Sequence, residues 1–274
     1  MAKYLKLFKT HTQYETYING QDAVKPNVSY CEDDNGVHYN PFVSTIITYE
    51  ATSKLVETTS QKNNGLHTNA FDCAIASHTF ENGVGTIEFD GEVTRFYNYA
   101  FIGCSEMTSI EIPSGVTMIN GHVFENCSGL TSIDILNSVT DIGSYAFSGC
   151  SGLTSVIIGS GVTYIGERAF TNCSSISSIT IPDSVTVIDT GAFAGCSGLT
   201  SAIIGSGITR IGGFAFGNCL HLDSITSRAT TAPTINNNPF EGVTSGGTLY
   251  VPIGSSGYDT WIYNKLPNWT MVEQ

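Results

Sequence analysis

A Phe-x-x-Cys pair recurs along most of this 274-residue chain at a fixed interval of 23 residues. The pairs are Phe101/Cys104, Phe124/Cys127, Phe147/Cys150, Phe170/Cys173, Phe193/Cys196 and Phe216/Cys219. Leu or Ile residues occupy fixed places between the pairs, and a regular period of about 20–29 residues with such places is typical of solenoids. The period therefore predicts a stack of similar coils.

The unit that begins at Cys127 shows how one coil is built. Ile133 and Ile135 alternate with polar residues as in a strand, and no stretch keeps the spacing of an amphipathic helix across the unit. One coil cannot bury its own apolar side chains, but a second coil stacked in parallel about 4.8 Å away covers them. We therefore expect a mainly β solenoid of short strands and turns.

Proline and glycine mark the expected corners. The first strand of a unit is followed by Pro113, Gly159, Pro182 or Gly205. Glycine also recurs after the second strand, where the sequence predicts a turn with positive φ. These glycines are Gly143, Gly166 and Gly212.

The six periodic cysteines suggest either disulfides or a ladder of reduced, buried thiols. Equivalent positions in a solenoid lie in equivalent surroundings, and a bonded pair would break that equivalence. Free cysteine is also among the most buried residue types, which favours the reduced ladder. Zinc is disfavoured because the paired C-x-x-C spacing of a tetrahedral site is absent from the sequence.

The I-P-x-S-V-T-x-I-G-x-x-A-F-x-x-C pattern of these units closely resembles the BspA-like leucine-rich repeats of gut and oral Bacteroidetes and of some protists. The resemblance covers roughly residues 84–274. It implies a right-handed leucine-rich-repeat solenoid that serves cell-surface adhesion and protein binding without enzymatic activity. The positions of the motif are structural, so the resemblance assigns no functional residue.

Charge limits the partners of the solenoid. The whole chain has a formal net charge of −13, and residues 81–274 carry five Lys and Arg against sixteen Asp and Glu. Such an acidic surface repels a phosphate backbone, so we expect no nucleic-acid partner. The sequence also has no run of 18 apolar residues that would span a membrane, and its start lacks the apolar core of a signal peptide.

Residues 1–41 differ from the rest and are expected to form a small α+β leader. The stretch Thr12–Asn19 predicts a short helix, and residues 28–31 and 37–39 predict a hairpin around an acidic Asp-Asn-Gly turn. The pattern K-Y-L-K-L-F, P-N-V-S-Y-C-E-D and V-H-Y-N-P resembles leaders of Bacteroides phage and prophage structural proteins. This resemblance implies an attachment or assembly module, and residues 1–83 leave room for oligomerisation.

Residues 42–83 are expected to cap the N-terminal end of the solenoid, because an open coil would expose strand edges and apolar side chains. Strands are predicted at residues 46–49 and 54–57. The repeats are expected over residues 84–226, and the first unit, from Val84, is degenerate.

Residues 227–274 are expected to form a C-terminal cap. The sequence predicts a long loop at residues 230–240 and a closing strand at residues 249–252. Large apolar side chains would then cover the open end of the core. They are Tyr258, Trp261, Tyr263, Leu266 and Trp269. The alternative for this end is an aromatic platform that binds carbohydrate.

No catalytic or cofactor motif is present. The sequence lacks G-x-S-x-G, H-E-x-x-H and G-x-x-x-x-G-K-[ST], and the serines of the repeats recur in sister units. We expect no enzymatic activity and no cofactor.

Two groups of potential metal ligands precede the repeats. The group Cys31, Glu32, Asp33, Asp34 and His38 lacks both the order of a calcium loop and the paired spacing of a zinc site, so a solvated turn is favoured over a metal. The other group, His67, Cys73 and His78, offers only three scattered ligands, and no metal is expected there.

Binding residues are expected where the repeat leaves positions free. The outward row of the first strand is Glu111, Asp134, Ile157, Thr180 and Ile203. The row of the second strand is Arg95, Met118, Asp141, Tyr164, Val187 and Arg210. The row of the following turn is Tyr99, His122, Tyr145, Arg168 and Phe214. Ile157 and Ile203 beside Tyr164 and Phe214 are the candidates for an apolar patch; the alternative is that these positions simply tolerate any residue.

The sequence therefore predicts a non-enzymatic binding module that recognises a protein or glycan on a cell surface. The leader and the absence of a signal peptide favour a phage or prophage tail-associated protein, located on a virion or cell surface. A secreted bacterial adhesin and a purely structural spacer remain the alternatives.

Overall fold

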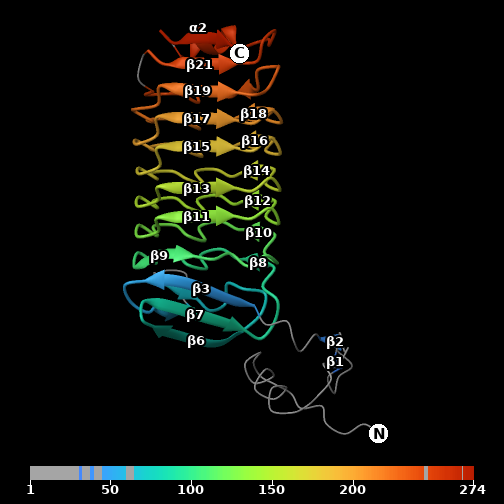
Figure 1. The fold of residues 1–274 in the computed structure, drawn as a ribbon, viewed down its shortest axis with the longest axis vertical. Coiled ribbons are helices and arrows are strands. Elements are labelled where there is room, and N and C mark those ends of the chain that lie inside the picture. Colours follow the sequence, from blue (N-terminus) through green and yellow to red (C-terminus); the bar gives the residue numbers. More distant parts are fainter. Residues whose placement is uncertain (1–30, 33–37, 40–44, 60–64, 244–245, 267) are drawn as a thin grey trace.

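The computed structural model describes residues 31–32, 38–39, 45–59, 65–243, 246–266 and 268–274, and it is a parallel β solenoid of about 23-residue turns (Figure 1). This confirms the predicted mainly β fold. Within the described residues there is one helix, α2 (Asp259–Asn264). No helix in this part of the chain is long and apolar enough to cross a membrane.

One side of the solenoid is an unbroken seven-stranded parallel ladder of two-residue strands. They are β8 (Arg95–Phe96), β10 (Met118–Ile119), β12 (Asp141–Ile142), β14 (Tyr164–Ile165), β16 (Val187–Ile188), β18 (Arg210–Ile211) and β20 (Thr234–Ile235). β20 lies inside the stretch where only a loop was predicted, residues 230–240, so that prediction was wrong. The loop region still supplies one more rung because Thr234 pairs with Arg210.

The other side carries longer strands, in which buried and exposed residues alternate as expected. They are β11 (Ser132–Ile135), β13 (Ser155–Ile158), β15 (Ser178–Ile181), β17 (Ser201–Ile204), β19 (Ser224–Ser227), β21 (Thr248–Val251) and β22 (Thr270–Glu273). β11 and β13 form one sheet, and β15, β17, β19, β21 and β22 form another. β22 is thus the closing strand, not residues 249–252.

The ladder breaks between β13 and β15, where a proline follows the later strand. In two other coils the equivalent N–H makes a bond to the preceding coil. The Gly159 N–H donates to the Ile135 carbonyl oxygen at 2.7 Å, and the Arg228 N–H donates to the Ile204 carbonyl oxygen at 2.9 Å. Pro182 occupies the equivalent position and has no N–H to donate. The substitution of proline for glycine therefore removes a bond between the coils at this corner.

The core contains two ladders of identical residues. Neighbouring rings of the phenylalanine ladder stack with centroids 5.0–5.9 Å apart and interplanar angles of at most 15°. The ladder consists of Phe101, Phe124, Phe147, Phe170, Phe193, Phe216 and Phe240. Each of these rings is almost completely buried.

The cysteines beside this ladder are free thiols, as the reduced-ladder prediction requires. Each thiol from Cys127 to Cys219 donates to the carbonyl oxygen of the phenylalanine in the preceding coil at 3.0–3.2 Å. Burial raises the pKa of Cys150 and of Cys219 to about 12. The thiols are therefore structural donors in the core and poor nucleophiles.

The predicted positive φ after the second strand falls two residues later than expected. Gly143, Gly166 and Gly212 have no positive φ, whereas Tyr145 (φ 60°) and Arg168 (φ 53°) do. A Cβ atom on Gly143 would lie 2.4 Å from the backbone carbonyl carbon of Asn120. Glycine is required here because adjacent coils approach closely, not because of its φ.

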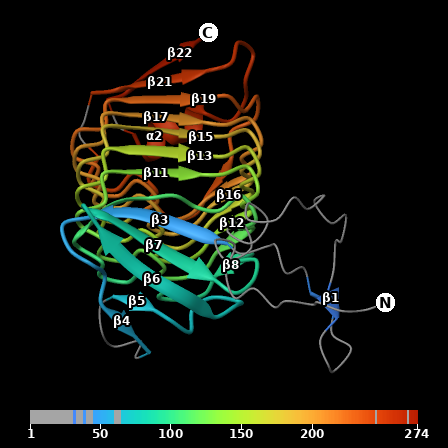
Figure 2. The same ribbon diagram turned by 60° about the horizontal axis from the view of Figure 1, so that its bottom comes forward.

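An antiparallel four-stranded sheet lies across the N-terminal end of the coils (Figures 1 and 2). Its order is β6 (Ile75–Glu81), β7 (Val84–Phe89), β3 (Ile46–Ala51) and β9 (Met107–Ile110). β7 begins where the first coil was predicted, but it is antiparallel to both neighbours. Asn82 (φ 51°) and Gly83 (φ 86°) form the tight turn between β6 and β7, a hairpin signal that the sequence analysis did not use.

The remaining N-terminal strands are two short pairs. β4 (Glu57–Thr58) and β5 (Leu66–His67) are parallel, so the strand predicted at residues 54–57 is shorter and shifted. β1 (Cys31–Glu32) and β2 (His38–Tyr39) form the predicted antiparallel hairpin. The helix predicted at Thr12–Asn19 lies outside the described residues. The domain boundaries at residues 41, 83 and 226 stay predictions.

The C-terminal end is closed largely as predicted. Tyr258, Trp261, Leu266 and Trp269 are buried, and the Trp261 ring lies 5.4 Å from that of Phe240 at the end of the phenylalanine ladder. Tyr263 is the exception, because 87% of it is exposed. An aromatic platform for carbohydrate would therefore have only Tyr263 of these side chains available.

Candidate functional site

The predicted row of the first strand is not continuous. Asp134 pairs with Ile157, and Thr180 pairs with Ile203, but the break between β13 and β15 separates the two pairs. Glu111 follows β9 and accepts a hydrogen bond from the Thr48 hydroxyl at 2.9 Å. The break forms a groove of about 310 Å³ beside Ile157, which is 58% exposed.

The row of the second strand is continuous, with Arg95, Met118, Asp141, Tyr164, Val187 and Arg210 in register. It belongs to a different sheet from Ile157 and Ile203. The structure therefore does not join those two isoleucines with Tyr164 and Phe214 into one sheet surface.

Polar contacts tie part of this second row to Asp189. The Tyr164 hydroxyl donates to the Asp189 carboxylate at 2.5 Å, and an Arg210 guanidinium nitrogen lies 3.5 Å from the other carboxylate oxygen. Burial and this bond to Asp189 raise the pKa of Tyr164 to about 12. Burial alone would raise the pKa of Asp189, but the bonds from Tyr164 and the Thr190 N–H and the charge of Arg210 lower it. The polar groups of Tyr164, Asp189 and Arg210 therefore bond to one another.

Four residues of the turn row form a continuous stack, which we call the ring row: Tyr99, His122, Tyr145 and Arg168. The ring centroids of Tyr99 and His122 lie 4.8 Å apart, and those of His122 and Tyr145 lie 4.9 Å apart. The Arg168 guanidinium lies 5.6 Å from the Tyr145 ring centroid and donates to the Tyr145 hydroxyl at 2.7 Å. The three rings are half-buried and Arg168 is exposed.

The backbone of the ring row is left-handed at every position. The φ angles run from 53° to 69°, a region that bulky residues adopt rarely. Hydrogen bonds between coils hold this conformation: the Tyr145 N–H donates to the Glu167 carbonyl at 2.8 Å, and the Arg168 N–H donates to the Thr190 carbonyl at 2.9 Å. The four side chains are therefore displayed from a rigid corner.

The ring row ends at Gly191, the next equivalent position, whose φ is 64°. Phe214, the last predicted member, lies beyond this gap and is 46% exposed. Within the row, His122 is fixed by Glu125, whose carboxylate lies 2.8 Å from His122 Nδ1. The predicted turn row thus consists of one contiguous group of four and an isolated phenylalanine.

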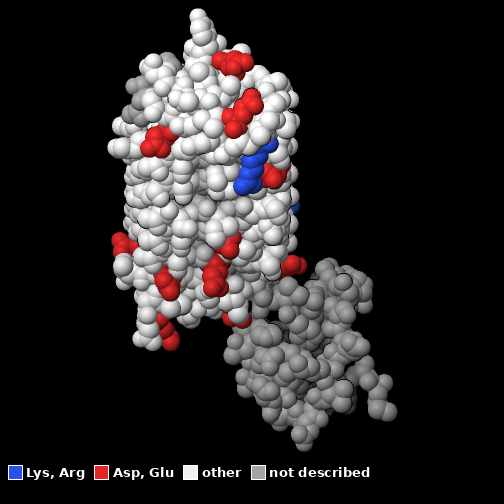
Figure 3. Space-filling model, turned by 45° about the horizontal axis from the view of Figure 1, so that its top comes forward, with Lys and Arg blue, Asp and Glu red and all other residues white. Residues whose placement is uncertain are grey.

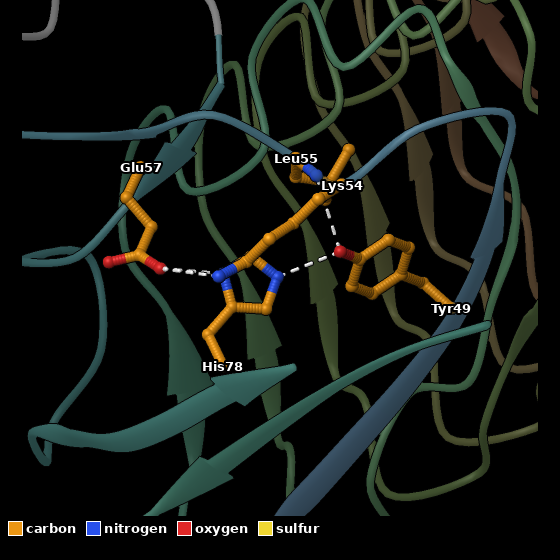
Figure 4. Close-up of polar contacts among 5 residues, drawn as sticks. All are labelled: Tyr49, Lys54, Leu55, Glu57 and His78. Atoms are coloured by element: carbon orange, nitrogen blue, oxygen red, sulfur yellow. Dashed lines mark hydrogen bonds and ion pairs between the residues drawn. The ribbon is translucent and has the colours of Figure 1, made fainter. Parts of the chain in front are cut away.

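Sequence reasoning missed a polar cluster in the N-terminal sheet (Figure 4). The Tyr49 hydroxyl lies 2.7 Å from His78 Nε2, and Glu57 Oε1 lies 2.7 Å from His78 Nδ1 (Figure 4). The Leu55 N–H donates to the Tyr49 hydroxyl at 3.3 Å. A neutral His78 protonated at Nδ1 satisfies all three contacts, with the Tyr49 hydroxyl donating to Nε2.

Burial dominates the electrostatics of this cluster. The His78 side chain is 2% exposed, and burial lowers its pKa despite the bond to Glu57. Burial also raises the pKa of Tyr49, which is 1% exposed. The cluster links β3, β4 and β6 through its hydrogen bonds. The Tyr49 hydroxyl is buried and cannot reach a substrate in solution, so the cluster does not present it as a nucleophile.

The two suggested metal sites gain no support in the described part of the chain. Both ring nitrogens of His78 face Tyr49 or Glu57. Among the described residues, no group of three or more His, Cys, Asp or Glu side chains is placed to hold a metal ion. Most of the group around Cys31 lies outside those residues.

Charge is unevenly distributed on the surface. Figure 3 shows Asp and Glu side chains scattered over one face, with Lys and Arg gathered mainly in one place beside an acidic side chain. Two further arginines have partners, since Arg228 lies 3.8 Å from Asp183 and Arg95 lies over the Tyr97 ring. This face offers no broad basic patch for a phosphate backbone.

Comparison with solved structures finds leucine-rich repeat proteins among the matches. A leucine rich cell surface protein from Faecalibacterium prausnitzii is 29% identical, with 59% of this chain and 40% of that one covered and a TM-score of 0.46. A leucine-rich repeat protein from Bacteroides ovatus is 22% identical, with 80% and 76% covered and a TM-score of 0.37. The pneumococcal vaccine antigen PcpA is 17% identical, with 66% and 64% covered and a TM-score of 0.34.

The chain thus spans less than half of the Faecalibacterium prausnitzii protein. No curated protein matches the sequence. The family model described as the BspA type leucine rich repeat region matches in six copies, over residues 66–150 and 117–247, which is more than half of the chain. This chain therefore belongs to the BspA-type leucine-rich repeat family, a membership that indicates a protein-binding or adhesion-type module on a typically non-enzymatic fold.

Proposed function

We propose that this chain recognises a protein or glycan on a cell surface, and that the ring row makes the central contact. Tyr99, His122, Tyr145 and Arg168 place aromatic, imidazole and guanidinium groups along one edge of a rigid solenoid. Tyrosine and arginine are among the side chains that dominate binding energy at protein interfaces. The family membership supports binding without chemical turnover.

The observation that carries this proposal is the left-handed backbone under large side chains. A non-glycine residue in this conformation costs about 1–2 kcal/mol. Gly191 shows that the same corner accepts glycine, which adopts a positive φ without that cost. Four neighbouring coils nevertheless keep large side chains here, and such outliers cluster at functional sites.

Stacking between the rings is the competing explanation. Each aromatic pair contributes about 0.5–1.5 kcal/mol beyond the area it buries, which offsets part of the backbone cost. Under this explanation the row would stabilise the corner and have no ligand, as in a structural spacer. Measuring binding and stability on the same variants separates the two explanations.

The proposed location of the protein is inferred from the sequence of the leader, residues 1–41, which precedes the coils. The leader pattern supports a phage or prophage tail-associated protein that carries the solenoid to a host surface. A secreted bacterial adhesin would use the same solenoid face on a cell. The binding proposal is the same for both locations.

Binding of the fluorescently labelled full chain to intact gut bacterial and epithelial cells tests the proposal. The double variant Tyr145→Gly/Arg168→Gly removes half of the ring row and fits the backbone. Its matched control is Tyr263→Ala, which removes an exposed aromatic side chain at the C-terminal end. We expect the double variant to bind at least tenfold more weakly than wild type and the control to bind normally.

Equal binding by wild type, double variant and control would overturn the role of the ring row. Absence of saturable binding by the wild type to every cell type would instead support the spacer. Treating the cells with protease or with periodate before binding shows whether the ligand is a protein or a glycan.

A further inference from the structure

A polar cavity of about 400 Å³ lies beside the N-terminal end of the ring row. Thr59 lines it just after β4, His67 lines it from β5, and Asn69 and Ala70 line it from the residues that follow β5. Tyr97, Asn98 and Asn120 line it from the first two corners of the coils. This volume falls within the range of small-molecule pockets, about 300–1,000 Å³.

The cavity occurs where the repeat departs from its own pattern. Tyr97 and Asn120 stand at the positions that later coils fill with Gly143 and Gly166. A Cβ on either glycine would lie within 2.8 Å of the backbone of the preceding coil. The first two corners carry an aromatic ring and a carboxamide, the next two carry closely packed glycines, and the equivalent Asp189 of a later coil is charged and bonded to Tyr164. A ring beside a neutral amide at this position therefore belongs to the N-terminal end of the described coils.

Both walls are held by backbone bonds and by the core. The His67 N–H donates to the Ala100 carbonyl at 2.8 Å, and the Tyr97 N–H donates to the Ala70 carbonyl at 3.0 Å. Behind them, Phe71 packs edge-on against Phe96, with the ring centroids 5.8 Å apart. The cavity is therefore preformed, which lowers the entropy cost of binding.

The lining combines carboxamides with one accessible ring. Asn98 Oδ1 accepts from the Gly121 N–H at 3.0 Å, which leaves its amide nitrogen as a donor. Among the described residues, the side-chain amides of Asn69 and Asn120 have no hydrogen-bond partner. Each such amide offers an acceptor oxygen and two donor hydrogens. The Tyr97 ring, 38% exposed, supplies an apolar surface, although the Arg95 guanidinium lies 5.9 Å from its centroid.

The absence of formal charge from the described lining narrows the ligand class. No Asp, Glu, Lys or Arg lines the cavity within the described residues. An anionic or cationic ligand would thus lose its hydration without gaining an ion pair there. A neutral sugar fits better, because its hydroxyl groups both donate and accept while its C–H face packs on an aromatic ring.

We propose that this cavity binds one unit of a neutral saccharide. The Tyr97 ring packs against the C–H face of the sugar, and the amides of Asn69, Asn98 and Asn120 bind its hydroxyl groups. This site is separate from the ring row, and its binding of a sugar does not depend on the ring row contacting a cell surface.

Saturation-transfer NMR on the full chain tests the site with glucose, galactose, mannose and N-acetylglucosamine, each at millimolar concentration. Sialic acid tests whether the cavity rejects a negatively charged sugar, and triglycine tests whether it recognises a peptide backbone instead of a sugar. We expect at least one neutral sugar to bind and both other probes to fail. Tyr97→Ala and Asn120→Asp should each weaken that binding at least tenfold, whereas Ile253→Ala, which shortens an exposed side chain after β21, should leave it unchanged.

Three results would overturn the saccharide site. The first is that none of the neutral sugars binds, and the second is that a sugar binds equally well to both pocket variants. The third is that triglycine binds the wild type and loses that binding in Tyr97→Ala. Unchanged thermal melting of both pocket variants is the control for folding, and two chemically different substitutions guard against the failure of one. Loss of cell binding by the ring-row variant with retained sugar binding would separate this site from the proposed function.

Discussion

The repeated coils and the N-terminal sheet are stabilised in different ways. From Phe124 to Phe216, each coil contributes the same buried ring and, from Cys127 on, the same thiol-to-carbonyl bond. The N-terminal sheet has no such repetition. Its strands depend on single contacts such as the Tyr49–His78–Glu57 cluster, which joins residues 21 and 29 positions apart in sequence.

This difference has consequences for both stability and pH response. Stability in the coils is spread over similar interfaces between neighbours, as expected of solenoids. Within the described residues, the phenylalanine ladder itself contains no group that titrates near neutral pH. The sheet places a buried histidine at one junction, so we expect this end of the solenoid to lose stability as pH falls.

The largest expected effect is from a cavity in the phenylalanine ladder. Phe170 is fully buried and stacks on both Phe147 and Phe193. Phe170→Ala should lower the free energy of unfolding by about 3–5 kcal/mol, measured by denaturant titration. Ile157→Ala, at an exposed position, should change it by less than about 0.5 kcal/mol. A small loss from Phe170→Ala would show that neighbouring coils collapse to fill the gap.

A smaller effect is expected where coils approach closely. A Cβ on Gly166 would lie 2.8 Å from backbone atoms of the preceding coil, so Gly166→Ala must push two coils apart. We expect a loss of about 1–3 kcal/mol in unfolding free energy, as for overpacked cores. Gly191→Ala is the comparison. Its added Cβ would contact the Arg168 side chain and no coil backbone, and alanine would have to adopt the left-handed φ of Gly191. Equal tolerance of both substitutions would refute the close-approach explanation for the first glycine.

At the N-terminal sheet, Tyr49→Phe should cost about 1–3 kcal/mol, because His78 Nε2 and the Leu55 N–H would lose their partner. The pH dependence has a definite sign. The folded-state pKa of His78 lies below its unfolded value near 6.5, so the unfolded state binds the proton more readily. The contribution of His78 is therefore complete above about pH 6.5 and is lost as pH falls through the folded pKa.

Denaturant titrations at pH 5 and pH 7.5 measure this dependence. The wild type should be less stable at the lower pH, and His78→Gln should reduce the difference between the two pH values. The Phe170→Ala variant, which leaves the cluster intact, should keep the full wild-type difference. An unchanged pH difference in His78→Gln would assign the response to other groups.

The smallest expected effect is the reactivity of the cysteine ladder. Cys127, Cys150, Cys173, Cys196 and Cys219 are buried and their pKa values are raised. Because the thiolate is the reactive form, iodoacetamide at about pH 8 should leave all five unlabelled in the folded protein. Mass spectrometry of peptides, with a denatured sample as control, checks this. Rapid labelling of any of the five would show that its coil opens.

The repeat was predictable because one periodic pattern specifies its strands, core and register. The spacing of Ile133 and Ile135 and the 23-residue interval were enough for the coils. The contacts between neighbouring coils were not predictable from one unit; examples are the close approach at Gly143 and the unmade bond at Pro182. The antiparallel sheet was missed because the Asn82–Gly83 turn has no counterpart in the repeats.

The candidate site was predicted as three rows, and the structure arranges only part of them continuously. Register alone placed Tyr99, His122 and Tyr145 on equivalent corners. Their stacking depends on a left-handed backbone that was assigned to glycines two residues earlier. The Tyr49–His78 contact could not be read from spacing, because it joins two strands of the irregular sheet.

We propose that the ring row keeps large side chains for recognition despite the cost to the backbone. Cell binding and melting temperature, measured together on Tyr145→Gly/Arg168→Gly, decide between recognition and a structural role. We expect at least a tenfold loss of binding with a melting temperature close to that of wild type. A large fall in melting temperature with unchanged binding by the remaining folded protein would contradict it, because the row would then be structural.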